Sequence, residues 1–142
     1  MKKLLVFVLA FAPLFAFSQS VFGKWKTIDD ETGREKSIVE IYEKDGKVYG
    51  KVVELFRLPS EDQDPICDLC DDDRKGKKVL GMEIIRDLEQ DDDEWEDGTI
   101  VDPKNGKVYD CALWLDEDDP NKLQVRGYIM FFFRTQTWLR AE

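Results

Sequence analysis

The most constraining feature of this sequence is a succession of short runs of β-forming residues separated by turn-forming residues. No stretch carries apolar residues at the i, i+3, i+4, i+7 spacing of an amphipathic helix over three turns. The pattern therefore predicts an all-β fold. The expected strands are 22–28, 36–42, 47–56, 79–88, 98–101, 107–115, 123–133 and 135–140.

About eight strands joined mostly by short turns are typical of an up-and-down sheet, and eight strands can close into a small barrel. Closure also removes the exposed strand edges that favour aggregation. We therefore predict one antiparallel β-barrel domain formed by residues 19–142, since a chain of this length suits a single domain.

The sequence predicts some of the connections between these strands more clearly than others. Asp45-Gly46 is a strong signal for a tight hairpin. Segment 58–78 is polar and acidic and is predicted to be a long loop, a kind of segment that is often functional. Segment 90–96 is predicted to be an acidic connection. Between Tyr128 and Arg140 there is no Gly, Pro, Asn or Asp, so the last two runs either turn without a usual turn residue or form one long bent strand.

Residues 1–18 have the three parts of a secretory signal peptide. Lys2 and Lys3 supply the positive start, segment 4–17 is apolar, and small residues precede a cleavage site near Ser18. As a helix, segment 4–17 would span about 21 Å, which is short of the ~30 Å hydrocarbon core of a membrane. We therefore expect a cleaved signal and a periplasmic or secreted mature protein without a membrane span.

The composition excludes several classes of function. The 142 residues carry 21 Lys and Arg against 31 Asp and Glu, a formal net charge of −10, which argues against nucleic-acid binding. The absence of histidine removes Ser-His-Asp triads, Cys-His dyads and His-ligated zinc centres. The acidic runs do not match the spaced carboxylates of a calcium loop, and no carboxylate pair stands out for glycoside hydrolysis. We therefore predict a non-enzymatic protein with no catalytic residue and no cofactor.

A set of short motifs runs in order through nearly all of the mature chain. They are Gly23-Lys24-Trp25-Lys26-Thr27, Lys47-Val48-Tyr49-Gly50-Lys51-Val52-Val53, Cys67 with Cys70, Leu80-Gly81-Met82, Asp102-Pro103-Lys104-Asn105-Gly106-Lys107-Val108-Tyr109, and Arg126-Gly127-Tyr128 through Thr137-Trp138. Together these motifs resemble an exported bacterial family called domain of unknown function 2147 (DUF2147). The resemblance implies a small secreted β-barrel of the lipocalin-like, or calycin, kind, and it brings no established activity or substrate.

Gly23 and Trp25 are also similar to the lipocalin signature, in which a first-strand Trp closes one end of the barrel beneath an Arg of the last strand. The resemblance implies that Arg140 is this Arg. An Arg over an indole face forms a cation–π contact worth about 1–2 kcal/mol when partly desolvated. The implied role of these three residues is structural closure of the barrel.

Three interpretations of Cys67, Cys70 and Cys111 remain open. A structural disulfide is preferred in an oxidising compartment, either between Cys67 and Cys70 or with Cys111 as the alternative partner. Three thiolates and an Asp could instead hold zinc, although we predict no metal site. Thiol exchange is disfavoured because the many nearby Asp residues should raise the pKa of the thiols.

The aromatic residues suggest two kinds of binding surface. Pockets in small barrels are apolar and aromatic, so a ligand cavity is predicted to be lined by Trp95, Trp114, Tyr49, Tyr109 and Tyr128. The unbroken apolar run from Tyr128 to Phe133 implies burial on both faces, a partner surface such as a homodimer or envelope protein, or a membrane contact.

Three functions follow from these features. The first is a non-enzymatic barrel that binds a small apolar ligand, and the second is a cell-envelope protein–protein interaction module with acidic loops. The third is a thiol oxidoreductase or zinc-binding protein that acts through Cys67 and Cys70. A cavity of several hundred Å³ would favour the first, whereas a filled core with Phe131 or Phe133 exposed would favour the second.

Overall fold

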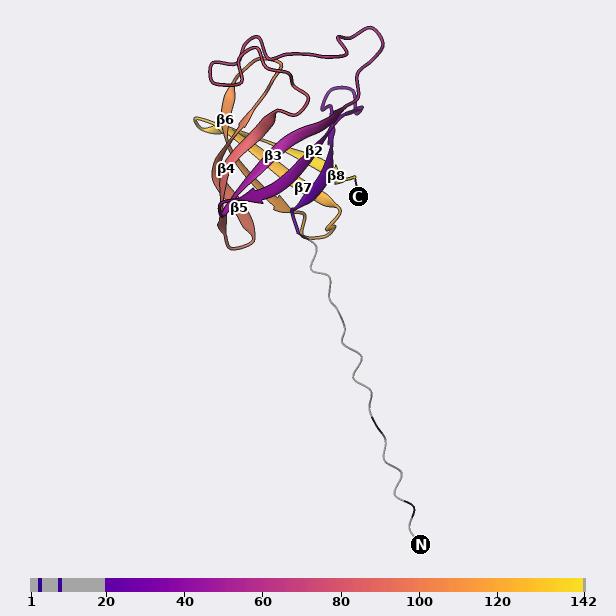
Figure 1. The fold of residues 1–142 in the computed structure, drawn as a ribbon. Coiled ribbons are helices and arrows are strands. Elements are labelled where there is room, and N and C mark those ends of the chain that lie inside the picture. The colour runs from indigo at the N-terminus through magenta and orange to yellow at the C-terminus, as the bar shows by residue number, and fades with distance from the viewer. Residues whose placement is uncertain (1–2, 4–7, 9–19, 142) are drawn as a thin grey trace.

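Each strand pairs antiparallel with the next one in sequence, and the last strand pairs with the first, so that the sheet closes into a barrel (Figure 1). The computed structural model describes residues 3, 8 and 20–141. The predicted antiparallel barrel is confirmed. The strands are β1 (Gly23–Ile28), β2 (Glu35–Lys44), β3 (Lys47–Leu55), β4 (Glu83–Asp91), β5 (Glu94–Val101), β6 (Val108–Leu115), β7 (Lys122–Ile129) and β8 (Phe132–Arg140).

Two of the predictions from the sequence concern the signal peptide and the lack of a membrane span. The signal peptide expected over 1–18 lies, apart from residues 3 and 8, outside the described residues. Among the residues that are described, no helix is long and apolar enough to cross a membrane.

The acidic stretch over 90–96 joins two strands, as the sequence indicates, but most of it is paired, because it forms the hairpin between β4 and β5. Gln90 pairs with Trp95 and Asp91 pairs with Glu94, around a turn in which Asp92 has a positive φ of 52°. Asp tolerates this conformation better than most residues. The hairpin end is exposed, so its acidic side chains remain in water while the backbone is paired.

The last hairpin follows one of the two alternatives left open by the sequence, a turn without a usual turn residue, but at a different position. Ile129 pairs with Phe132, so Met130 and Phe131 are the two turn residues between β7 and β8. Met130 has a φ of 53°, as the first central residue of a type II′ turn requires. The chain therefore turns without a usual turn residue, three positions earlier than expected.

Side chains fill the interior of the barrel. Inward residues alternate with outward ones along the strands, as in β3, where Val48, Gly50 and Val52 are buried and the residues between them are half-buried. The largest fully buried side chains are Trp25, Ile41, Ile85, Leu88, Leu113, Leu123, Val39, Val48, Cys67, Cys70 and Cys111.

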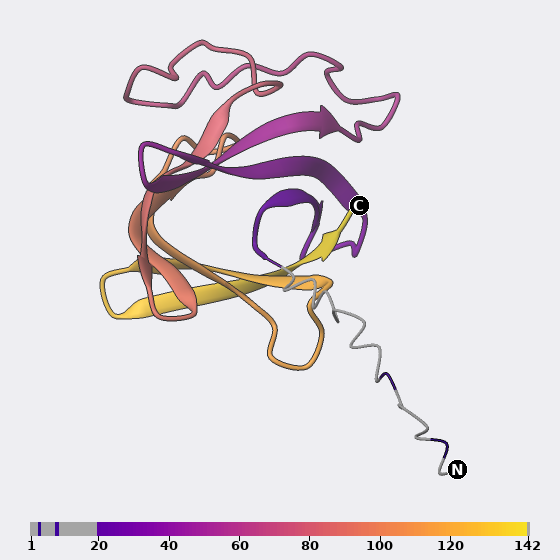
Figure 2. The same ribbon diagram turned by 60° about the horizontal axis from the view of Figure 1, so that its bottom comes forward.

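The barrel has two different ends. The end at the bottom of Figure 1, called here the Arg140 end, carries the start of β1, the connections after β2, β4 and β6, and the end of β8. The opposite end, called the loop end, carries the turns after β1, β5 and β7 and the long loop 56–82. In both views the long loop lies over this second end (Figure 2).

Backbone hydrogen bonds attach the long loop to the barrel. The N–H of Gly81 donates to the carbonyl of Val52 at 2.7 Å, and the N–H of Val52 donates to the carbonyl of Met82 at 2.9 Å. Val79 and Met82 are buried in the core. The end of the loop therefore belongs to the folded core.

Arg74 is the buried charged residue that holds the middle of the loop. Its Nε donates to both carboxylate oxygens of Asp72 at 3.1 Å, and its Nη1 donates to the carbonyl of Glu83 at 2.9 Å. The hydrogen bonds from Arg74 lower the pKa of Asp72 to about 2. A buried charge needs such a partner, so this pair fixes the loop against the start of β4.

Acid is expected to weaken this loop through Asp72. Its folded pKa of about 2 lies below its ordinary value of 3.8, so the stabilisation is present above the ordinary value and is lost as the pH falls toward 2. Replacing Asp72 by Asn should lower the free energy of unfolding at neutral pH, and the difference from wild type should shrink toward zero between these pH values. Urea unfolding across a pH series measures this. A difference that does not change with pH would contradict a role for the carboxylate charge.

Candidate functional site

The three residues implied in barrel closure lie together at the Arg140 end. The guanidinium carbon of Arg140 lies 4.2 Å from the ring centroid of Trp25, which is fully buried. Gly23 lies beside Arg140 and has a φ of 117°, a conformation that glycine adopts readily and other residues rarely do. Arg140 Nη2 also donates to the carbonyls of Ser20 and Pro120, both at 2.9 Å. The guanidinium therefore joins the start of β1, the β6–β7 turn and the end of β8.

The structure joins Cys67 to Cys70 and leaves Cys111 unpaired. Both sulfurs of the disulfide belong to fully buried residues. Cys111 lies on the inner face of β6, where burial raises the pKa of its thiol to about 12. In the described part of the chain, no group of three His, Cys, Asp or Glu side chains is arranged to hold a metal ion. A thiol with this pKa is almost entirely protonated at neutral pH and is a poor nucleophile.

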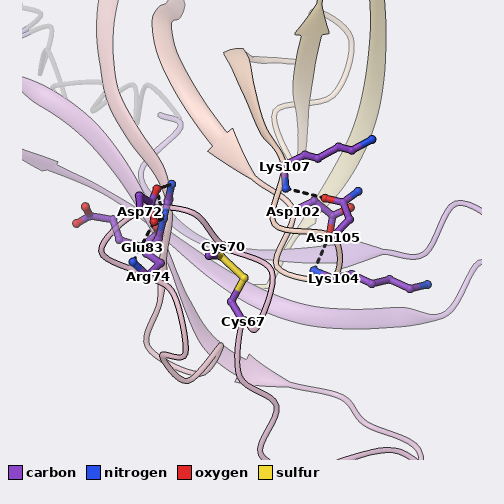
Figure 3. Close-up of a disulfide and its surroundings, with 9 residues drawn as sticks. All are labelled: Cys67, Cys70, Asp72, Arg74, Glu83, Asp102, Lys104, Asn105 and Lys107. Carbon is purple, nitrogen blue, oxygen red and sulfur yellow. Dashed lines mark hydrogen bonds and ion pairs between the residues drawn. A yellow bond between two sulfur atoms is a disulfide. The ribbon is translucent and has the colours of Figure 1, made fainter.

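The disulfide segment packs on the turn between β5 and β6 (Figure 3). That turn is held by the N–H of Gly106, which donates to the carbonyl of Asp102 at 2.7 Å, and by the side chains of Asp102 and Asn105. A Cβ on Gly106 would lie 1.9 Å from the carbonyl oxygen of Leu69 and 2.7 Å from the nitrogen of Cys70. The Cys67 and Cys70 pair and the motif that contains Gly106, which are separate in the sequence, thus pack against each other.

The five aromatic residues predicted to line one cavity do not converge. Trp95 and Tyr109 alternate with buried residues and face inward, toward opposite ends of the barrel. Tyr49 faces outward, where it stacks on Tyr42 with ring centroids 5.9 Å apart and donates to Asp87 at 2.9 Å. Trp114 and Tyr128 also face outward, on β6 and β7.

Two hollows in the surface are open to solvent. One, of about 420 Å³, lies between the long loop and β4, and its charged lining residues are Asp73, Arg74, Lys77, Lys78, Glu83 and Arg86. In it, Arg86 donates two hydrogen bonds to Asp73 and one to Glu83, and this pairing lowers the pKa of Asp73.

The second hollow, of about 320 Å³, lies over β5, β6 and β7 and includes Glu96, Asp97, Asp110 and Tyr128. A hydrogen bond with Asp91 raises the pKa of Glu96. Neither hollow has the enclosed apolar lining of a small-ligand pocket.

The most exposed apolar group of the described structure is the tip of the β7–β8 hairpin. Ile129, Met130, Phe131, Phe132 and Phe133 have relative exposures of 50, 91, 97, 74 and 61%. We call these five residues the apolar tip. The burial that the sequence offered as one explanation of this run is therefore wrong, and an exposed apolar group of this kind is characteristic of an interaction site. In both ribbon views the hairpin projects at the left (Figures 1 and 2).

A row of aromatic side chains continues from the apolar tip along the outer wall. The guanidinium carbon of Arg126 lies 4.4 Å from the ring centroid of Phe133 and 4.9 Å from that of Trp114. Its Nε donates to the hydroxyl of Thr135 at 2.7 Å. The rings of Tyr128 and Phe133 lie 6.2 Å apart. These contacts hold Arg126 between two rings, so the outer face of the hairpin is both aromatic and ordered.

Comparison with known proteins supports the fold and supplies no activity. The family model described as "Uncharacterized protein conserved in bacteria (DUF2147)" matches residues 23–140. A Helicobacter pylori protein, HP1028, described as belonging to the lipocalin family, superposes with a TM-score of 0.71 at 17% sequence identity. The superposition covers 87% of this chain and 84% of HP1028. A comparison with curated proteins gave no match.

Proposed function

The chain belongs to the bacterial family DUF2147, and from this premise we propose that it is an exported, non-enzymatic interaction protein whose recognition surface is the apolar tip. The single observation that carries the proposal is the exposure of Met130, Phe131 and Phe132 on one hairpin. Leaving large apolar side chains in water forgoes about 25 cal/mol for each Å² that a partner would cover. Covering the tip by a partner is therefore favourable.

The filled barrel supports an external binding surface over an internal one. The inward positions of the strands are occupied by large apolar side chains, and both solvent-filled hollows are charged.

Two further features support export and the absence of enzymatic activity. The pattern of residues 1–18 and the disulfide between Cys67 and Cys70 both suit an oxidising compartment outside the cytoplasm. Full burial of the disulfide and the high pKa of Cys111 argue against thiol exchange. We propose that the mature protein comprises residues 19–142 as one domain.

Photo-crosslinking from the tip tests this function. A benzoyl-phenylalanine is placed at Phe131, the chain is expressed with its own leader, and intact cells are irradiated. The control carries the same group at Asp118, an exposed residue of the β6–β7 turn at the opposite end of the barrel. We expect a discrete light-dependent adduct from the tip that the control lacks. Equal adduct patterns from both positions, or none from the tip, would reject the proposal.

A second candidate function is favoured by the lipocalin-like barrel itself. A small apolar ligand would have to enter at the loop end, where the long loop covers the barrel, and it would contact Tyr109 rather than the outward Trp114. Native mass spectrometry of the protein purified from its compartment tests this. A discrete adduct that is released on denaturation would support a carrier, and a bare protein mass would contradict it.

A further inference from the structure

The barrel is incompletely paired where β8 meets β1. The ladder between these strands consists of Trp25 with Arg140 and Lys26 with Leu139. On its other side β8 is paired with β7 along its whole length, from Phe132 to Leu139. In the described structure, segment 132–137 of β8 therefore has a ladder partner on one side and lacks one on the other.

The register shows which backbone groups face the unpaired side. Ile129 and Phe132 flank a two-residue turn, so they exchange hydrogen bonds with each other, and Arg134 and Gln136 follow in the same phase. The alternate residues Phe133, Thr135 and Thr137 direct their N–H and C=O groups away from β7. The same phase is seen beyond them, where the N–H of Ala141 donates to the carbonyl of Lys24 on β1.

This edge lacks the devices that usually prevent strand addition. Natural edges are protected by Lys, Pro, bulges or unpaired charges. Segment 132–137 contains neither Lys nor Pro, and its one charged residue, Arg134, forms an ion pair with Asp30 at 2.6 Å. Phe133, Thr135 and Thr137 are all exposed. The side chains of Arg134 and Gln136 both bond to Asp30 of the β1–β2 turn. In the described structure, however, Phe133, Thr135 and Thr137 have no backbone hydrogen bond on that side. The backbone of this edge is therefore unpaired, its charge is locally balanced, and its first two residues belong to the apolar tip.

We propose that the occupant of this edge is β8 of a second copy of this chain, added antiparallel about a two-fold axis at Thr135. This inference rests on the proposed function and names the partner of the tip. In this register Thr135 pairs with Thr135 of the partner subunit. Phe133 pairs with Thr137 of the partner subunit. The backbone groups of Phe133, Thr135 and Thr137 in each copy then form hydrogen bonds with the other copy, and the two barrels share one continuous sheet across the interface.

Three observations favour a second copy over a lipid surface. The outward N–H and C=O groups gain hydrogen bonds from a strand, whereas burial in hydrocarbon would leave them unsatisfied. A formal charge of −10 repels anionic lipids, while the edge itself is balanced by Asp30. Phe132 and Phe133 point to opposite faces of the sheet, so an added strand is contacted from both sides.

Light scattering coupled to size-exclusion chromatography tests the pairing on the purified mature protein. Wild type is expected to be dimeric at about 100 µM and to dissociate on dilution. Thr135→Pro removes an outward N–H without removing a bond to β7 and should raise the dissociation constant at least about tenfold. The matched control Thr135→Val loses the hydroxyl contact with Arg126 but keeps the edge N–H, and it should remain dimeric.

The outcomes separate this inference from the proposed function. A monomeric wild type, or a Thr135→Pro protein that is folded by circular dichroism and still dimeric, would overturn the β8 edge as the interface. If Thr135→Pro fails to fold, Thr135→Lys serves instead, because it adds like charges across the axis and should also give monomers. An adduct from Phe131 to another protein or to lipid, with a monomeric wild type, would retain the tip as a recognition surface and reject the second copy.

Discussion

Replacing Gly106 by alanine is expected to destabilise the protein by more than about 3 kcal/mol. Gly106 has a φ of 74°, a conformation that costs a residue with a side chain roughly 1 kcal/mol or more. The added Cβ would also lie 1.9 Å from the carbonyl oxygen of Leu69 and 2.2 Å from its carbon. Those atoms are backbone, and the disulfide beside them limits how far they can move. The loop would have to leave the β5–β6 turn.

Urea unfolding followed by circular dichroism measures this loss. Gly76 is the matched control, since it has a φ of 71° but no atom within 4 Å of an added Cβ. Gly76→Ala should therefore cost about 1 kcal/mol, the conformational part alone. If Gly106→Ala and Gly76→Ala lowered the free energy of unfolding by similar small amounts, the disulfide segment would not be in close contact with the turn.

Replacing Arg140 by alanine is expected to cost about 2–3 kcal/mol. The substitution removes the cation–π contact with Trp25 and the aliphatic stem that covers its ring, so a fully buried indole becomes exposed at the Arg140 end. It also removes the donor to the carbonyls of Ser20 and Pro120. Burial lowers the pKa of Arg140, so the guanidinium has already given up part of its hydration in the folded protein.

Tryptophan fluorescence during urea unfolding gives the stability. Because the chain has four tryptophans, the exposure of Trp25 is taken from the shift of the folded-state emission relative to wild type. Arg134→Ala is the control, because Arg134 is an exposed arginine of the same strand in a surface ion pair and should cost less than about 1 kcal/mol. Arg140→Lys keeps the charge but lacks the planar donor fork, so its loss should be intermediate. Equal stability of Arg140→Ala and Arg134→Ala would contradict a closing role for Arg140.

The fold was predictable because alternation and turn residues are local signals. Asp45-Gly46 correctly predicted a tight hairpin, in which Lys44 pairs with Lys47. The hairpin over 90–96 was missed because acidic side chains indicate exposure, and the exposed end of a hairpin satisfies that condition as well as a loop does. The turn at Met130 was missed because a positive φ there follows from strand pairing and not from a turn-forming residue.

The site was less predictable because it depends on contacts between distant segments. The spacing of Cys67 and Cys70 suggested a disulfide, but nothing local indicated that their loop packs on Gly106. The apolar run of the last hairpin was visible in the sequence, whereas its exposure depends on where β7 and β8 turn. Hydropathy alone does not distinguish a strand end that projects beyond the core from a strand that is buried in the core.

The order of the strands has a consequence for how the chain folds as it emerges during synthesis. Seven of the eight strand junctions join neighbours in sequence and can form as each strand emerges. The eighth joins β1 to β8 and must wait until residues 132–140 have emerged. Until then the emerging chain is an open sheet with two unsatisfied edges, which is the state most prone to aggregation. Ring closure, with Arg140 seated on Trp25, is therefore expected to be the last step of maturation.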